Sequence, residues 1–179
     1  MAEIVLERLE WPDLPAVEAL LEACGEQHRL ALGRPPGPGA AEAHCAGLPR
    51  GVPRTRKHLL GITDAGTREL MGLIDAVVHF PDAATLTVGL FLISPLHSEG
   101  STPQIARGLL EVWATERWMR HVRVEVSANS WSALQFWQSA GFVAEAAPIR
   151  AGRGLVVVFE KQLVCGTSAD RELASLRLE

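Results

Sequence analysis

Residues 85–93 read TLTVGLFLI, an apolar run of strand length that ends at Ser94-Pro95. A loop of small and polar residues, HSEGST (97–102), follows it. Apolar residues then recur at helical spacing, which predicts a long helix over 103–120. Its candidate buried positions are Ile105, Leu109, Val112, Trp113 and Trp118.

A second strand and helix come directly after this unit. The alternating sequence VRVEV predicts a strand over 122–126, and WSALQFWQSA predicts a helix over 131–140. Gly141 follows as a C-terminal cap. Because a long helix joins the strand 85–93 to the strand 122–126, we expect these two strands to be parallel neighbours.

The rest of the chain predicts an α/β fold. The strands 58–63 and 69–80 precede the strand that ends at residue 93, and together the three form an antiparallel meander. Residues 31–53 are rich in Pro and Gly, and we expect no regular structure over much of their length. Further strands are predicted at 4–9, 142–147 and 155–163, and further helices at 13–24 and around 40–46.

Length and composition limit the class of protein. The 179 residues, 47% of them hydrophobic, predict one globular domain over 1–164, with a polar C-terminal tail over 165–179. A net charge of −4 argues against nucleic acid or an anionic membrane as the main partner. Three scattered cysteines, with no C-x-x-C pair, argue against a disulfide framework or a metal site and favour a cytoplasmic protein. The first residues lack the apolar stretch of a signal peptide.

The order of elements from Thr85 to Phe142 resembles the GNAT superfamily of N-acetyltransferases. This resemblance implies a mixed, mostly antiparallel central sheet of six or seven strands flanked by helices. It also implies that acetyl-CoA binds between the strands that end at Ile93 and begin at Val122. The pantetheine arm would pair with the free backbone of Phe91, Leu92 and Ile93, although a simple buried strand explains the same side chains.

The loop before the long helix corresponds to the phosphate-binding loop of this family. The family pattern is Arg or Gln, two residues, Gly, one residue, then Gly or Ala, and this chain has His97-x-x-Gly100-x-Thr102. The first amide groups of a helix suit a diphosphate, and Gly100 lets the backbone approach it. The alternative is an ordinary helix start with a Ser101 or Thr102 cap and a capping box with Gln104. The predicted phosphate-binding residues are His97, Ser98, Glu99, Gly100, Ser101 and Thr102.

Glu125 is the predicted general base. In related N-terminal acetyltransferases, the glutamate of a similar strand takes the proton of the amine, and a tyrosine twelve positions later acts as acid. Here that position is Trp137, and the chain has no tyrosine. Indole cannot act as an acid near neutral pH. The alternatives are that Glu125 is a surface carboxylate, or that Asp75 or His79 is the base.

The second helix is expected to begin at a polar cap that contacts the cofactor. The family places an asparagine seven residues before the tyrosine, and here that position is Ser130, with Asn129 directly before it. We therefore assign both residues to the predicted cofactor site.

The resemblance implies transfer of an acetyl group from acetyl-CoA to a primary amine of a small molecule or peptide. The alternatives are a non-enzymatic acyl-CoA-binding or regulatory protein, and an unrelated α/β nucleotide-binding module. Domains of this family often form homodimers, but no interface can be read from the sequence. Residues 25–55 and the strand ends are expected to shape the acceptor pocket.

Overall fold

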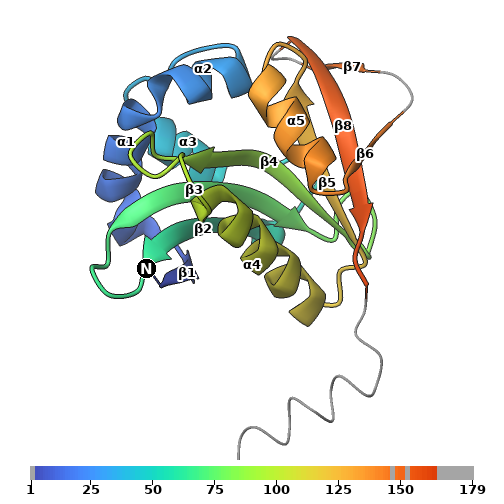
Figure 1. Cartoon of the computed structure of the whole chain (residues 1–179), viewed down its shortest axis with the longest axis horizontal. Coiled ribbons are helices and arrows are strands. Elements are labelled where there is room, and N and C mark those ends of the chain that lie inside the picture. The colour runs from blue at the N-terminus through green and yellow to red at the C-terminus, as the bar shows by residue number, and fades with distance from the viewer. Residues whose placement is uncertain (1–2, 146–147, 152–153, 165–179) are drawn as a thin grey trace, which may run out of the picture.

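The computed structural model describes residues 3–145, 148–151 and 154–164. Within them, one mixed sheet of eight strands has the order β1-β2-β3-β4-β5-β8-β6, and β7 pairs with β8 (Figure 1). The predicted tail over 165–179 lies outside the described residues. The strands are β1 (Ile4–Arg8), β2 (Lys57–Asp64), β3 (Leu70–Val78), β4 (Thr85–Ile93), β5 (His121–Ser127), β6 (Val143–Ala144), β7 (Ile149–Ala151) and β8 (Gly154–Gln162).

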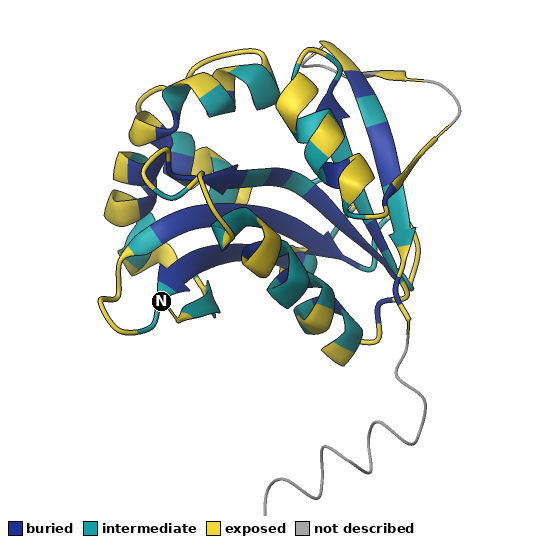
Figure 2. Ribbon diagram, viewed as in Figure 1, coloured by how far each residue is buried: buried dark blue, intermediate teal, exposed yellow. Residues whose placement is uncertain are grey.

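Helices cover both faces of this sheet and bury its apolar side chains (Figure 2). One face packs against the last two helices and the other against the first three, so the domain has three layers. In the part of the chain that the structure describes, none of the helices has the length and apolar character needed to cross a membrane. The helices are α1 (Leu14–Ala23), α2 (Gly25–Leu32), α3 (Ala40–Ala46), α4 (Thr102–Glu116) and α5 (Trp131–Ser139).

The strand pairings confirm the α/β fold and its predicted mixed sheet. Strands β2, β3 and β4 form the antiparallel meander, and β4 and β5 are parallel neighbours. The sheet has one strand more than the upper limit predicted, because β7 adds a short strand at the edge of β8. The pairing of β3 with β4 shifts by one residue at Asp75/Ala76, and Gly89 is the unpaired residue of β4 there.

The predicted buried positions of the long helix were wrong for Ile105, Val112 and Trp118, whereas Trp113 packs against the core. The residues that are buried are Ala106, Leu110 and Ala114, which recur at intervals of four. Val112 and Trp118 are 57% and 70% exposed. The small alanines let the helix lie close to the sheet, whereas the larger residues were chosen from hydrophobicity alone. Ile105 is also exposed, and Leu109 and Trp113 are half-buried.

This face gives a test of the packing. We expect Leu110→Ala to destabilise the domain by about 2–5 kcal/mol, because it leaves a cavity under α4. Val112→Ala on the exposed face should change the stability by less than about 0.5 kcal/mol. Urea unfolding followed by circular dichroism measures both variants. Equal losses in the two would contradict the assigned face.

Helix α2 was not predicted. It begins at Gly25, one residue after α1, and ends at Leu32, where the C-cap residue Gly33 has the left-handed φ of 78° that glycine tolerates. The helix α3 over Ala40–Ala46 was predicted. Helix α3 and the last two residues of α2 give regular structure to part of the Pro- and Gly-rich range 31–53.

Candidate functional site

Strands β4 and β5 separate along their length. Their pairing runs from Thr85 opposite His121 to Val88 opposite Val124 and goes no further, although β4 continues to Ile93. Gly89, the bulge residue, lies where the pairing stops. Beyond it, β4 is paired with β3 on one side only. Backbone groups on its other side therefore face a gap in the sheet where a ligand could pair with them.

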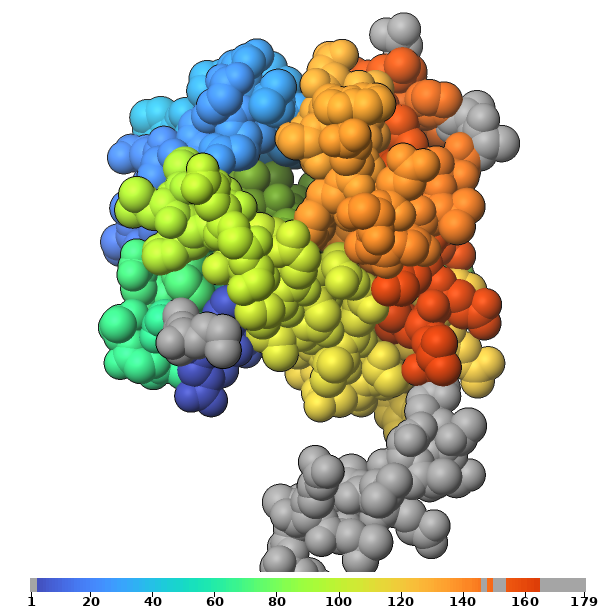
Figure 3. Space-filling view, in the orientation of Figure 1, coloured from blue at the N-terminus to red at the C-terminus, as the bar shows by residue number. Residues whose placement is uncertain are grey.

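Two adjoining pockets occupy this gap, and we call them together the cleft. Figure 3 shows the surface hollowed between α2 and α5, with β4 at the bottom. The pocket at the split encloses about 390 Å³ and the outer pocket about 780 Å³, both including space open to solvent. Five residues line both pockets: Ala31, Phe91, Ser130, Ala133 and Trp137.

Aromatic side chains form one wall of the cleft. The indole of Trp137 is 4% exposed and packs edge-on against Phe91, Phe136 and Phe142, with ring centroids 5.4, 5.1 and 4.8 Å away. Such edge-to-face contacts fix the rings relative to one another. Trp137 therefore shapes the cleft at the position that the family gives to its acid.

Glu125 lines the pocket at the split, between Val124 and Val126 of β5. Its neighbours point to the core on the α4 side, so its carboxylate lies on the opposite face of the sheet, under α2. The side chain is half-buried and makes polar contacts of its own. A carboxylate is thus present where the two strands separate.

The rival bases lie elsewhere. Asp75 belongs to β3, lines neither pocket of the cleft, and is bonded to Lys57 and His44. His79 does not continue the strand as predicted, because β3 ends at Val78 and His79 has a left-handed φ of 55°. It lies in the β3–β4 turn, at the end of β4 remote from Ile93.

The residues predicted to bind the pantetheine arm and the phosphates fall into two groups: some line the outer pocket and the others do not. Phe91, Leu92, Ile93 and Ser98 line the outer pocket. His97 does not, because its Nε2 lies 2.9 Å from Oε1 of Glu69 on the loop before β3. Glu99, Gly100, Ser101 and Thr102 do not line the outer pocket, although their neighbours in the sequence, Ser98 and Pro103, do; Thr102 is the first residue of α4.

The start of α4 lacks the predicted side-chain cap. Ser101 is the N-cap residue, but its hydroxyl makes no capping bond, and Gln104 turns its amide toward the carbonyl groups of Gly100 and Ser101. Gly100 has a φ of 84°, and apart from its two chain neighbours no protein atom lies within 4 Å of where its Cβ would be. The first amides of the helix are therefore left for a ligand or water.

Ser130, and not Asn129, faces the cleft. Ser130 is the N-cap residue of α5 and lines both pockets, although its hydroxyl does not cap the helix. Asn129 is exposed in the preceding turn and lines neither pocket.

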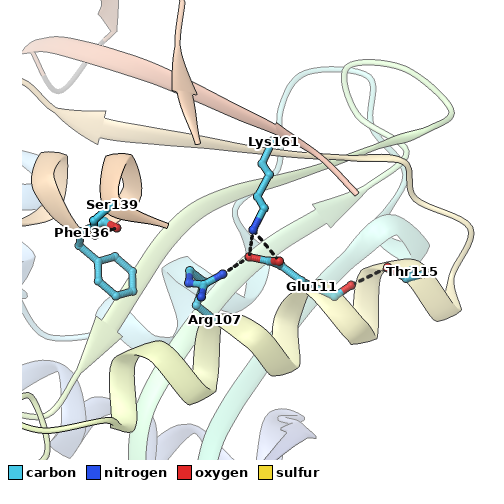
Figure 4. Close-up of polar contacts among 6 residues, drawn as sticks. All are labelled: Arg107, Glu111, Thr115, Phe136, Ser139 and Lys161. Carbon is cyan, nitrogen blue, oxygen red and sulfur yellow. Dashed lines mark hydrogen bonds and ion pairs between the residues drawn. The ribbon is translucent and has the colours of Figure 1, made fainter. Parts of the chain in front are cut away.

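A group of charged residues joins α4 to β8 outside the cleft. Both oxygens of Glu111 accept bonds from Nζ of Lys161, at 3.0 and 2.9 Å, and Oε1 also pairs with Arg107 (Figure 4). All three side chains are largely buried. This group joins α4 to the strand β8. The first turn of α4 borders the cleft, so the contact helps to fix the position of that turn relative to the sheet.

The described residues do not include a metal site, since no three of their His, Cys, Asp or Glu side chains are grouped to hold an ion. Burial raises the pKa of Cys24 to about 11, so this cysteine stays a thiol near neutral pH. Its Sγ lies 3.7 Å from the carbonyl oxygen of Ile93, and it lines neither pocket of the cleft.

Comparison with known proteins gives a fold. No protein-family model matches the sequence, and no curated protein does either. Solved structures do match. An acetyltransferase from Thermus thermophilus has a TM-score of 0.71 at 18% identity, with 91% of this chain and 100% of that chain covered.

Two further structures carry more specific descriptions. The spermidine N-acetyltransferase from Vibrio cholerae, solved with CoA and spermine, has a TM-score of 0.69 at 15% identity, covering 89% of this chain and 95% of its own. The ribosomal-protein-S18-alanine N-acetyltransferase from Escherichia coli has a TM-score of 0.64 at 15% identity, covering 92% and 97%. This chain therefore has the fold of the GNAT acetyltransferases.

Proposed function

We propose that this protein is a GNAT N-acyltransferase that moves an acetyl group from acetyl-CoA to a primary amine. The observation that carries the proposal is the cleft at the separation of β4 and β5, with unpaired β4 backbone on one side and Glu125 at its inner end. The fold shared with acetyltransferases supports it.

The donor would lie along β4 toward the start of α4. Free backbone groups between Gly89 and Ile93 would pair with the peptide-like pantetheine arm. The uncapped first turn of α4, with Gly100 before it, would bind the pyrophosphate through amide groups and the helix dipole. In this arrangement the thioester end reaches the pocket that Glu125 lines.

Glu125 would act as the general base. Its carboxylate takes a proton from the amine, directly or through one water, so that the nitrogen lone pair can attack the thioester carbonyl carbon. The new C–N bond replaces the C–S bond, CoA leaves as a thiolate, and the second proton that the nitrogen loses on becoming an amide passes through water to that thiolate or to solvent. The cleft contains no phenol to protonate that thiolate, since the whole chain lacks tyrosine.

The acceptor is a small or peptidic amine in this proposal. The two more specific neighbours are named for spermidine and for a protein alanine, so both kinds belong in a substrate panel. A panel of amines with acetyl-CoA, followed by release of the CoA thiol, tests the function. Amine-dependent release is expected. Firm binding of acetyl-CoA without transfer to any amine would instead support the non-enzymatic alternative, which the missing tyrosine favours.

The missing acid can be supplied by substitution. We expect Trp137→Tyr to raise kcat, because it places a phenol at the position of the family's acid, and general acid catalysis is worth ~10²–10⁴-fold. Trp137→Phe is the matched control, because it removes the indole without adding an acid. Steady-state kinetics with the best amine measures both. A folded Trp137→Tyr variant no faster than Trp137→Phe would contradict a role for an acid at this position.

A further inference from the structure

A chain of bonded side chains runs through the layer of α1–α3, outside the cleft. Nδ1 of His28 lies 2.9 Å from the carbonyl oxygen of Arg34, and its Nε2 lies 3.2 Å from Nε2 of His44. Nδ1 of His44 lies 3.2 Å from Oδ2 of Asp75. Oδ1 of Asp75 accepts a bond from Nζ of Lys57. The chain thus links α2, α3, β3 and β2.

All of these side chains are shielded from solvent. His28 is 3% exposed, and the side chains of His44, Asp75 and Lys57 are 13%, 12% and 9% exposed. A buried polar atom without a partner costs about 1–3 kcal/mol. Loss of the hydrogen bond at any ring nitrogen of His28 or His44 would therefore destabilise the fold.

Counting the ring protons that these hydrogen bonds require gives the charge of the two histidines together. The carbonyl of Arg34 can only accept, so Nδ1 of His28 must carry a proton. The carboxylate of Asp75 already accepts from Lys57, so Nδ1 of His44 must carry one as well. The contact between the two Nε2 atoms needs one proton more. Two neutral imidazoles hold two protons, and this pair needs three.

We propose that His28 and His44 share three ring protons as a singly charged pair, and that this pair clamps α2 over the cleft in a pH-dependent way. The clamp matters to the cleft because three residues of the same helix line it: Gln27, Leu30 and Ala31. Helix α2 also packs against β4 and β5. His28 and His44 are positioning residues in this account and do not touch the cleft.

The hydrogen bonds of the histidine pair, and not the charges around it, favour the third proton. Asp75 from β3 and Lys57 from β2 face His44 and balance each other, and Arg34 faces His28 from the segment after α2. From α1, Glu18 accepts the amides of Gly39 and Ala41 at the start of α3 and so holds that helix without contacting either ring. The pKa of His28 is lowered, mainly by burial; its bond to the carbonyl of Arg34 raises it, and the charges of His44 and Arg34 lower it further.

The proton count sets the direction of the pH effect on both sides. A fourth proton at low pH would place two N–H groups against each other, and the lowered pKa of His28 opposes it down to acidic pH. Loss of the third proton at high pH would leave one of three contacts without a proton: the two Nε2 lone pairs opposed, the carbonyl of Arg34 without a donor, or the carboxylate of Asp75 without a donor. The clamp is therefore strongest between these limits and weakens on either side.

Nitrogen NMR of the histidine rings tests the proton count in the full chain without any ligand. We expect three protonated ring nitrogens in the pair near neutral pH and a scalar coupling between the two Nε2 atoms across their shared proton. Two rings that titrate independently, with no such coupling between about pH 5 and about pH 9, would overturn the proposal. Burial, and then the charges of Arg8 and Arg117, lower the pKa of His58 to about 4, so this ring stays neutral over the tested pH range and adds no protonated ring nitrogen of its own to the count.

Asp75→Asn is the sharpest variant. Its amide oxygen can still accept from Lys57 while its NH₂ donates to Nδ1 of His44, so the pair then needs only two protons. We expect the Nε2 coupling to persist to higher pH than in the wild type. A coupling lost at the same pH in both proteins would contradict the three-proton pair.

Hydrogen exchange of α2 then tests the clamp itself. His44→Gln should speed exchange of the amides of His28 and Gly33, which bond to Cys24 and Arg29, relative to wild type. His79→Asn is the matched control, since it removes a histidine at the far turn, where asparagine tolerates the left-handed φ. Equal exchange in His44→Gln and the control would refute the clamp. The link to the cleft rests on the proposed function, and the pH profile of acetyl-CoA affinity tests it separately.

Discussion

Glu125→Gln is expected to lower kcat by ~10²–10⁴-fold, because the amide keeps the shape of the side chain but cannot take a proton from the amine. The Kd for acetyl-CoA should stay nearly unchanged, since the proposed donor contacts come from β4 and the start of α4. Loss of kcat with unchanged donor binding would separate a chemical role from a binding role. Thiol-release kinetics and calorimetry measure the two quantities.

The control for this variant is Glu160→Gln. Glu160 lies on the adjacent strand β8 and lines neither pocket of the cleft, so the same chemical change there should leave kcat within about twofold. Equal activity of the wild type and Glu125→Gln across the pH range would remove Glu125 from the mechanism. It would also reopen the case for Asp75.

Gly100→Val is expected to abolish the rise in melting temperature that acetyl-CoA causes in the wild type. A ligand that binds only the folded state raises this temperature by mass action. The branched side chain would stand in front of the first turn of α4, where the pyrophosphate is proposed to bind. It would also strain the backbone, since φ at Gly100 is 84°. Differential scanning fluorimetry with increasing acetyl-CoA gives the shift.

Two controls separate obstruction from strain. Gly100→Asn adds a side chain that tolerates the left-handed conformation, so its unliganded melting temperature should stay closer to the wild type than that of the valine variant. Gly108→Ala, inside α4, adds a Cβ that meets no atom within 4 Å and should retain the full shift with acetyl-CoA. A full shift in Gly100→Val would place the cofactor elsewhere.

The order of elements in the sequence was enough to predict the core of the fold. The link between Ile93 and Val122 through a long helix favoured parallel strands, and β4 and β5 are parallel. The order of elements did not predict which face of α4 is buried. Ala106 and Ala114 pack closest to the sheet because they are small, and hydrophobicity alone ranks Val112 and Trp118 above them.

The site was harder to predict from the sequence than the fold, because contacts between residues far apart in the sequence shape it. Glu125 was predicted from its strand and lies in the cleft, whereas the contact of His97 with Glu69 joins residues 28 positions apart. Ala31, which lines both pockets, falls within the range 25–55 expected to shape the acceptor pocket, but it was not singled out because the Pro- and Gly-rich sequence after it hid α2. The pair of histidines carries no local signal, since His28 and His44 are 16 residues apart on different helices.

The most direct test of this account is hydrogen exchange with and without acetyl-CoA, resolved to single amides. We expect acetyl-CoA to protect the amides of Gly89–Ile93 that face the gap between β4 and β5, together with those of Gly100, Ser101 and Thr102. Amides of the β3–β4 turn around His79, far from the cleft, should be unaffected. Protection confined to other parts of the chain, or no protection at saturating acetyl-CoA, would contradict the central claim that this cleft binds the acyl donor.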